Sequence, residues 1–270
     1  MKKISRRSFL AAAGLSVAAL ALTACGGSSS TASSEAASTS AAAGELTTVE
    51  AGKLTMATNA TFPPYEMTTD SGDIEGIDVD TAKAIAEKLG LELQIDDMDF
   101  DAALLSVQQG KADIAMAGIT VTDERKAVMA FSDSYATGIQ SIIVPEGSGI
   151  ASPDDLAGKK IGTQRGTTGY IYCSDDFGDE NVVAYDSGLT AVQALNNGQV
   201  DAVVIDNAPA QEYVAANPGL VVLDTSYAEE DYAIGMAKGS ALEDAINAAL
   251  EELKADGTLQ SIVDKYITAE

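Results

Sequence analysis

The sequence predicts an α/β fold, and two observations support that prediction. Stretches with the apolar pattern of β-strands alternate with stretches that have the apolar spacing of α-helices along the 270-residue chain. Several of the helical stretches end at a glycine, the residue most common just past a helix C-terminus. Alternation of this kind is typical of sheets flanked by helices.

The first elements set the pattern. We expect a strand at 54–58 and then a helix at 78–89, which Gly90 closes. One apolar face of this helix consists of Ala82, Ile85, Ala86 and Leu89. Further strands are expected at 91–95, 114–117, 140–144, 160–162, 182–185, 202–205, 221–223 and 233–237, and further helices at 100–109, 241–255 and 259–266.

Residues 1–24 have the features of a signal peptide, namely a basic start, a short apolar run and a small-residue cleavage site. The apolar run is shorter than the about 20 residues of a transmembrane helix. The tetrapeptide that ends it, Leu22-Thr23-Ala24-Cys25, resembles the lipobox of bacterial lipoproteins. This resemblance implies that Cys25 is acylated and tethers the protein to the membrane. The Arg6-Arg7 pair resembles a twin-arginine export signal, but general secretion signals also contain paired arginines.

Residues 25–51 are predicted to form a flexible linker, because most of this stretch is Ser, Ala and Gly and lacks large apolar side chains. The whole chain carries 16 basic and 41 acidic residues, so we expect no nucleic-acid partner. With Cys25 acylated, Cys173 is the one remaining thiol, and no internal disulfide is expected.

Two segments of the chain resemble each other: SVQQGKADIAMAGI at 106–119 and ALNNGQVDAVVIDN at 194–207. The matched positions are Gly110 with Gly198 and Asp113 with Asp201. Chance is an alternative, because glycine-capped loops between helices and strands are common. A true repeat predicts two similar lobes whose strands present their carboxyl ends to one ligand.

Several short motifs occur in a fixed order. They are ATNATFPPYE (57–66), GIDVD (76–80), DMDF (97–100), ADIAMAGITVTDERK (112–126), RGTTG (165–169) and DAVVIDNAP (201–209). Together they resemble motifs of the bacterial extracellular solute-binding proteins of family 3, the polar amino acid receptors of ABC importers. The resemblance implies a two-lobed periplasmic-binding-protein fold of type II, with two crossover strands at a hinge. Lobe 1 would comprise 52–137 and 229–270, and lobe 2 would comprise 138–228.

The resemblance also implies a pocket for the α-carboxylate of an amino acid. Arg125 would bind the carboxylate, since a planar guanidinium offers two parallel donors. The Gly118 N–H and the Thr120 hydroxyl would complete this pocket. From the opposite lobe, the loop of Gly166 and Thr168 would donate from a helix N-terminus. From the residues alone, Arg125 could instead be a surface charge that pairs with neighbouring acids next to a threonine-capped helix.

Other residues would bind the rest of the ligand. Asp206 would accept the α-amino group, although it could also cap a helix. Phe62 and Phe100 would flank the ligand side chain, although an aromatic residue that opens a helix often belongs to the core. Asn59 stands where the glutamine- and histidine-binding members have aspartate, so neutral amino acids, glutamine first, are expected to bind before cationic ones. Gln164 could hydrogen-bond a polar side chain, and acids within 96–101 could also reach the pocket.

The sequence thus predicts a monomeric receptor, anchored by lipid outside the cytoplasmic membrane, that delivers a polar amino acid to ABC permease subunits. No cofactor and no metal are expected. A dehydratase on the same fold, acting on arogenate or a related cyclohexadienyl acid, is the enzymatic alternative. The chain has no histidine, so acid–base chemistry would rest on carboxylates. A sensory module is a further alternative, for which no membrane or signalling segment is expected after Glu270.

Overall fold

A computed structural model of the chain describes residues 46–267. These residues lie within one compact unit, Gly44–Glu270. The predicted signal peptide, the twin-arginine pair, Cys25 and linker residues 25–45 lie outside the described residues. Within 46–267, no helix combines the length and the apolar character that crossing a membrane requires.

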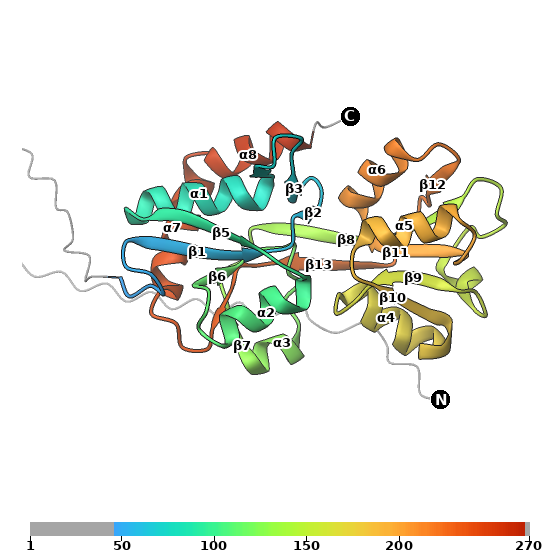
Figure 1. Cartoon of the computed structure of the whole chain (residues 1–270), viewed down its shortest axis with the longest axis horizontal. Helices are drawn as coiled ribbons and strands as arrows, with labels where there is room; N and C mark the ends of the chain where they lie inside the picture. Colours follow the sequence, from blue (N-terminus) through green and yellow to red (C-terminus); the bar gives the residue numbers. More distant parts are fainter. Residues whose placement is uncertain (1–45, 268–270) are drawn as a thin grey trace, which may run out of the picture. The chain divides into compact units, whose positions relative to one another are not determined.

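The first sheet has five strands, in the order β5 (Glu92–Asp97), β1 (Lys53–Thr58), β6 (Ile114–Ala115), β14 (Gly235–Ala237) and β7 (Met129–Phe131). The β1 strand is parallel to β5 and β6, whereas β14 is antiparallel to β6 and β7. One face carries α1 (Ile77–Leu89), α7 (Glu243–Ala255) and α8 (Thr258–Tyr266), and the other carries α2 (Phe100–Gln108) (Figure 1).

The second sheet has the order β10 (Val182–Tyr185), β9 (Ile161–Gln164), β11 (Ala202–Asp206), β8 (Ala136–Pro145) and β12 (Leu220–Val222). A further strand, β13 (Ala228–Tyr232), pairs with β8. Helix α4 (Thr168–Phe177) covers one face of this sheet, and α5 (Gly188–Asn196) and α6 (Asn207–Ala216) cover the other (Figure 1).

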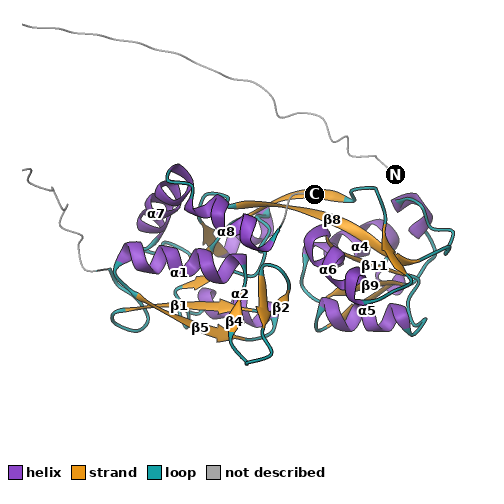
Figure 2. Ribbon diagram, turned by 90° about the horizontal axis from the view of Figure 1, so that it is seen from above, coloured by secondary structure: helices purple, strands orange, loops and turns teal. Residues whose placement is uncertain are grey.

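Strands β8 and β13 connect the two lobes. They pair antiparallel from Gln140 with Ala228 to Ala136 with Tyr232, and they run side by side between the two groups of elements (Figures 1 and 2). The chain enters the second lobe along β8 and returns along β13 to the first sheet. The prediction of two α/β lobes joined by two crossover strands is therefore confirmed. The lobe boundaries at 137/138 and 228/229 stay a prediction.

The ranges expected from the sequence leave out the three helices of the second lobe, α4, α5 and α6, as well as several short elements and one longer strand. Beside the first sheet lie β2 (Thr61–Phe62), β3 (Glu66–Thr68), β4 (Ile74–Glu75) and α3 (Asp123–Val128), and 3₁₀ turns occupy Pro153–Leu156 and Asp179–Asn181. The missed longer strand is β13, whose sequence AEEDY contains three acids. Its burial alternates, with Glu230 and Tyr232 buried and Glu229 and Asp231 exposed. Acidic residues on a half-buried strand conceal the apolar alternation that marks most strands.

The internal repeat is confirmed by matched local structure. Gly110 and Gly198 have φ values of 65° and 67°, a conformation that favours glycine. Asp113 accepts a hydrogen bond from the backbone N–H of Thr55 at 2.8 Å. Asp201 accepts the equivalent bond from Lys160 at 2.8 Å. In each lobe this aspartate fixes the start of a strand, β6 or β11, that leads to the space between the lobes.

Candidate functional site

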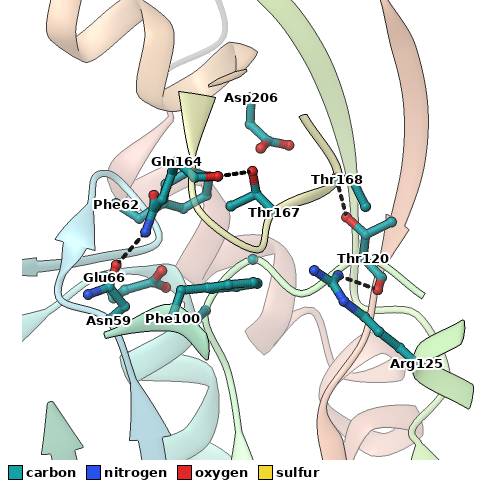
Figure 3. Close-up of a pocket in the computed structure, with 12 residues that line it drawn as sticks. Asn59, Phe62, Glu66, Phe100, Thr120, Arg125, Gln164, Thr167, Thr168 and Asp206 are labelled. Carbon is teal, nitrogen blue, oxygen red and sulfur yellow. Dashed lines mark hydrogen bonds between the residues drawn. The ribbon is translucent and has the colours of Figure 1, made fainter. Parts of the chain in front are cut away.

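A cavity between the two sheets is lined by residues of both lobes (Figure 3). The lining includes the predicted residues Asn59, Phe62, Phe100, Gly118, Thr120, Arg125, Gln164, Thr168 and Asp206. The lining also includes Glu66, Ala117 and Thr167, which were not among the predicted ligand-binding residues. The remaining predicted residue, Gly166, does not line the cavity but contacts Arg125.

Arg125 is buried at one end of the cavity, and only 8% of the residue is exposed. It lies in α3, whose N-terminus is capped by the Thr122 side chain. Its guanidinium donates from Nη1 to the Thr120 carbonyl at 2.8 Å and from Nη2 to the Gly166 carbonyl at 3.1 Å. None of the ion pairs among residues 46–267 involves Arg125. The alternative of a surface charge paired with neighbouring acids is therefore wrong.

The Arg125 guanidinium keeps the donors that an anion requires. A guanidinium has five N–H groups, and two of them serve the carbonyls, so one N–H remains on each of Nη1 and Nη2. The carbon Cζ lies 5.3 Å from the ring centroid of Phe100, which supports the plane of the group. Burial lowers the pKa of Arg125, while the nearby Glu230 opposes that change. An arginine side chain stays charged in proteins, so the buried Arg125 guanidinium is suited to bind an anionic group of a ligand.

Gly118 does not have the predicted role. Its N–H donates to the Oδ2 atom of Asp78 at 3.0 Å and is therefore not available to a ligand carboxylate. The residue has a φ of 55°, and a Cβ there would approach Phe62 Cε1 to 2.7 Å. Nearby, Thr120 forms a β-bridge with Tyr232 in which the flanking residues exchange the hydrogen bonds. The Thr120 N–H consequently faces away from Tyr232 and is better placed to donate to an anion.

Asp206 lies where β11 ends and α6 begins, and its side chain makes no capping hydrogen bond. Its Oδ2 accepts from Gln140 Nε2 at 2.8 Å, and its Oδ1 accepts from the Tyr232 hydroxyl. Burial raises the pKa of the Asp206 carboxyl well above its ordinary value, and Glu230 raises it further. A cationic group in the cavity would compensate for that burial.

The opposite end of the cavity contains a pair of amides. Gln164 of lobe 2 donates from Nε2 to the Oδ1 atom of Asn59 at 2.9 Å, across the gap between the lobes. Asn59 in turn donates to the Met98 carbonyl at 2.9 Å. The acids of 96–101 do not line this cavity. Asp99 and Asp101 line a separate cavity.

Glu66 is the residue that most changes the chemistry of this end. It is fully buried, it lines the cavity, and neither carboxyl oxygen accepts a hydrogen bond from another described residue. Burial raises the pKa of Glu66 well above its ordinary value, and the neighbouring Asp78 raises it further. The sequence signal was present, because Glu66 closes the motif ATNATFPPYE.

The chain is similar along most of its length to several known proteins. The profile of the bacterial extracellular solute-binding proteins, family 3, matches residues 54–269. A probable histidine-binding protein of Neisseria gonorrhoeae is 34% identical over 96% of this chain and 95% of its own length. The arginine-binding extracellular protein ArtP of Bacillus subtilis is 33% identical over 93% and 94%. A solved ancestral arginine-binding protein bound to glutamine is 42% identical, covers 81% of this chain and 99% of its own, and has a TM-score of 0.77.

These relatives are solute-binding proteins, so the chain is a binding protein and not the dehydratase considered above. The two lobes have the arrangement of type II periplasmic binding proteins. The relatives also support export from the cytoplasm and a polar amino acid as the class of ligand. The chain therefore belongs to the bacterial extracellular solute-binding proteins of family 3.

Proposed function

We propose that this protein captures an α-amino acid with a cationic side chain between its lobes and delivers it to the permease of an ABC importer. The observation that carries this proposal is the distribution of charge in the cavity. Arg125 lies at one end, Glu66 lies at the other, and Asp206 faces the space between them (Figure 3). The three groups would match a carboxylate, a side-chain cation and an α-ammonium.

The α-carboxylate would bind to the two free N–H groups of the Arg125 fork. The Thr120 N–H and the N-terminal turn of α4, which begins at Thr168, would add further donors. Asp206 would accept from the α-ammonium. Phe62 and Phe100 would form apolar walls beside the ligand side chain. Gly166 would act indirectly, because its carbonyl holds the Arg125 guanidinium.

The side-chain preference depends on Glu66. A zwitterionic ligand balances Arg125 and Asp206 and leaves the Glu66 carboxyl without a cationic partner. A buried carboxylate is costly unless a cation accompanies it. A guanidinium, ammonium or imidazolium at the distal end would provide that cation. The names of the histidine-binding and arginine-binding relatives support the same class of ligand.

Glutamine is the second candidate, and the amide pair of Asn59 and Gln164 favours it. Both side chains can exchange hydrogen bonds with a ligand amide, and a protonated Glu66 would then remain neutral. The ancestral relative with glutamine bound is consistent with this alternative. The glutamine preference expected from Asn59 assumed that no carboxylate lies near the ligand side chain, whereas Glu66 does line the cavity.

Calorimetry with arginine, citrulline and glutamine tests the proposal. Citrulline has nearly the shape of arginine without its charge. We expect arginine to bind at least about tenfold more tightly than citrulline, the lower range for a hydrogen bond to a charged group. Glu66→Gln should remove most of that difference. Tighter binding of glutamine than of arginine would establish the second candidate, and no binding of any amino acid would refute the receptor function.

Tethering and delivery complete the proposal. A lipid on Cys25 and a flexible linker would hold the receptor near the membrane while leaving its lobes free to move. Ligand contacts from both lobes would favour the closed arrangement, which the permease would then recognise. The receptor is proposed to act as a monomer, since one chain supplies both halves of the cavity.

A further inference from the structure

Glu230 is a buried acid on the crossover strand β13, and only 6% of it is exposed. Its Oε2 atom accepts three hydrogen bonds, each of 3.0 Å. The donors are the Thr120 hydroxyl of lobe 1, the Thr168 hydroxyl of lobe 2 and the Gln140 amide of β8. One oxygen atom therefore joins both lobes and both crossover strands. Glu230 does not line the cavity, but Thr120 and Thr168 do.

These hydrogen bonds determine what the two threonine hydroxyls can do. A hydroxyl has a single proton and two lone pairs. Thr120 and Thr168 both donate that proton to Glu230, so their Oγ1 atoms, 3.4 Å apart, offer only lone pairs to other groups. The sequence predicted that the Thr120 hydroxyl helps to bind the ligand carboxylate. In this arrangement that hydroxyl cannot donate to a carboxylate, because its proton is used by Glu230. It can accept from a ligand N–H.

Gln140 extends the same arrangement to Asp206. Its Nε2 donates to Glu230 at 3.0 Å and to Asp206 at 2.8 Å, so both amide protons are used and the amide orientation is fixed. The Tyr232 hydroxyl donates to the other oxygen of Asp206. Glu230 is thus linked, directly or through Gln140, to three acceptors of residues that line the cavity. Those acceptors are the two threonine hydroxyls and the Asp206 carboxyl.

We propose that Glu230 is a positioning residue that makes the Thr120 and Thr168 hydroxyls acceptors for the α-ammonium group of the ligand. The proposal rests on the proposed function, since it requires an amino acid in this cavity. An ammonium has three protons, and it would meet Asp206 and the two hydroxyl oxygens in a roughly tripodal arrangement. Glu230 would not touch the ligand, and it would act through side chains that do.

A comparison of each amino acid with its des-amino analogue tests this role. The ligand pairs are arginine with 5-guanidinopentanoate and glutamine with 4-carbamoylbutanoate, measured by calorimetry. In Glu230→Met, which lacks the acceptor, we expect the affinity for the amino acid to fall at least about tenfold. The affinity for the analogue should fall much less. Glu230→Gln should keep most of the preference for the amino acid, because its amide oxygen can accept the same hydrogen bonds.

Thr120→Val provides a second variant, which keeps the buried acid and two of the three hydrogen bonds that it accepts. If its hydroxyl accepts from the α-ammonium, this variant should weaken the amino acid more than the analogue. If the hydroxyl donates to the carboxylate, both ligands should weaken equally, since both contain that group. Equal losses in Thr120→Val, or in a folded Glu230→Met, would overturn the role of Glu230. Failure of the wild type to bind either amino acid would instead refute the proposed function.

Discussion

The guanidinium of Arg125 in lobe 1 donates from Nη2 to the backbone carbonyl of Gly166 in lobe 2 at 3.1 Å. The residue proposed to bind the ligand carboxylate therefore also holds the opposite lobe. The Arg125 guanidinium thus serves both ligand binding and the contact between the lobes, and its removal should weaken both.

Arg125→Ala should weaken amino acid binding by about 2 to 5 kcal/mol, the usual cost of removing one partner of a buried charge pair. Arg125→Lys should recover only part of the loss, because an ammonium lacks the forked geometry. Calorimetry measures both variants. Arg165→Ala is the matched control, since the Arg165 side chain is 58% exposed. An Arg125→Ala protein that binds within about twofold of wild type, well under the tenfold change worth 1.4 kcal/mol, would contradict the site.

Gly166→Ala should impair lobe closure without unfolding either lobe. Gly166 has a φ of 75°, and a Cβ there would overlap the Asp101 carboxylate of the opposite lobe. Gly198→Ala is the control, because it has a similar φ of 67° and no atom within 4 Å of the added Cβ. Small-angle X-ray scattering should show less compaction with ligand for Gly166→Ala than for Gly198→Ala. Asp101→Ala in the same chain should restore part of the closure.

Asp78 should give the free protein an unusual dependence of stability on pH. Burial raises its pKa from 3.8 to about 6, so the folded protein binds this proton more tightly than the unfolded chain does. Its contribution to stability is therefore greatest near pH 4 and declines by up to about 3 kcal/mol as the pH rises through 6. Urea unfolding at pH 4 to 7 should show that the stability of wild type relative to Asp78→Asn falls as the pH rises. A constant difference would show that the carboxyl titrates normally.

Binding of arginine should release protons through Glu66. The pKa of Glu66 is raised in the free protein, and a guanidinium beside it would lower that pKa. Arginine should thus bind more weakly as the pH falls below the pKa of the free protein. Calorimetry in buffers of different ionisation enthalpy measures the released protons. The Glu66→Gln protein should release fewer, and equal release by the two proteins would assign the protons to another group.

The proposed lipid anchor can be tested apart from the binding site. Cys25→Ala should move the protein from the membrane fraction to the soluble fraction while its affinity for the amino acid stays unchanged, since a flexible linker separates the two functions. Fractionation after a salt wash and calorimetry provide the two readings. Cys173→Ala is a suitable control, because Cys173 is buried and burial raises the pKa of its thiol to about 12. Retention of Cys25→Ala on membranes would argue for a different attachment.

The sequence predicted which residues line the cavity better than it predicted which of their groups donate hydrogen bonds and which accept them. Motif order located Arg125, Asp206 and the aromatic walls, because side-chain type and position along the chain carry that information. The direction of individual hydrogen bonds depends on contacts between distant segments. The Gly118 N–H donates to Asp78 instead of being free for a ligand, and the Thr120 hydroxyl donates to Glu230. Neither partner is recognisable until β13 and α1 are placed beside the cavity.

The pairing of β8 with β13 also limits how the lobes can move. Two strands that are hydrogen-bonded from 136 to 140 and from 228 to 232 form a ribbon, which bends across its flat face more readily than it slides along its length. The lobes should therefore open and close by a hinge motion about this ribbon, along a single arc. A longer ligand would stop that movement earlier, so ligands of different length should leave the two lobes at different angles.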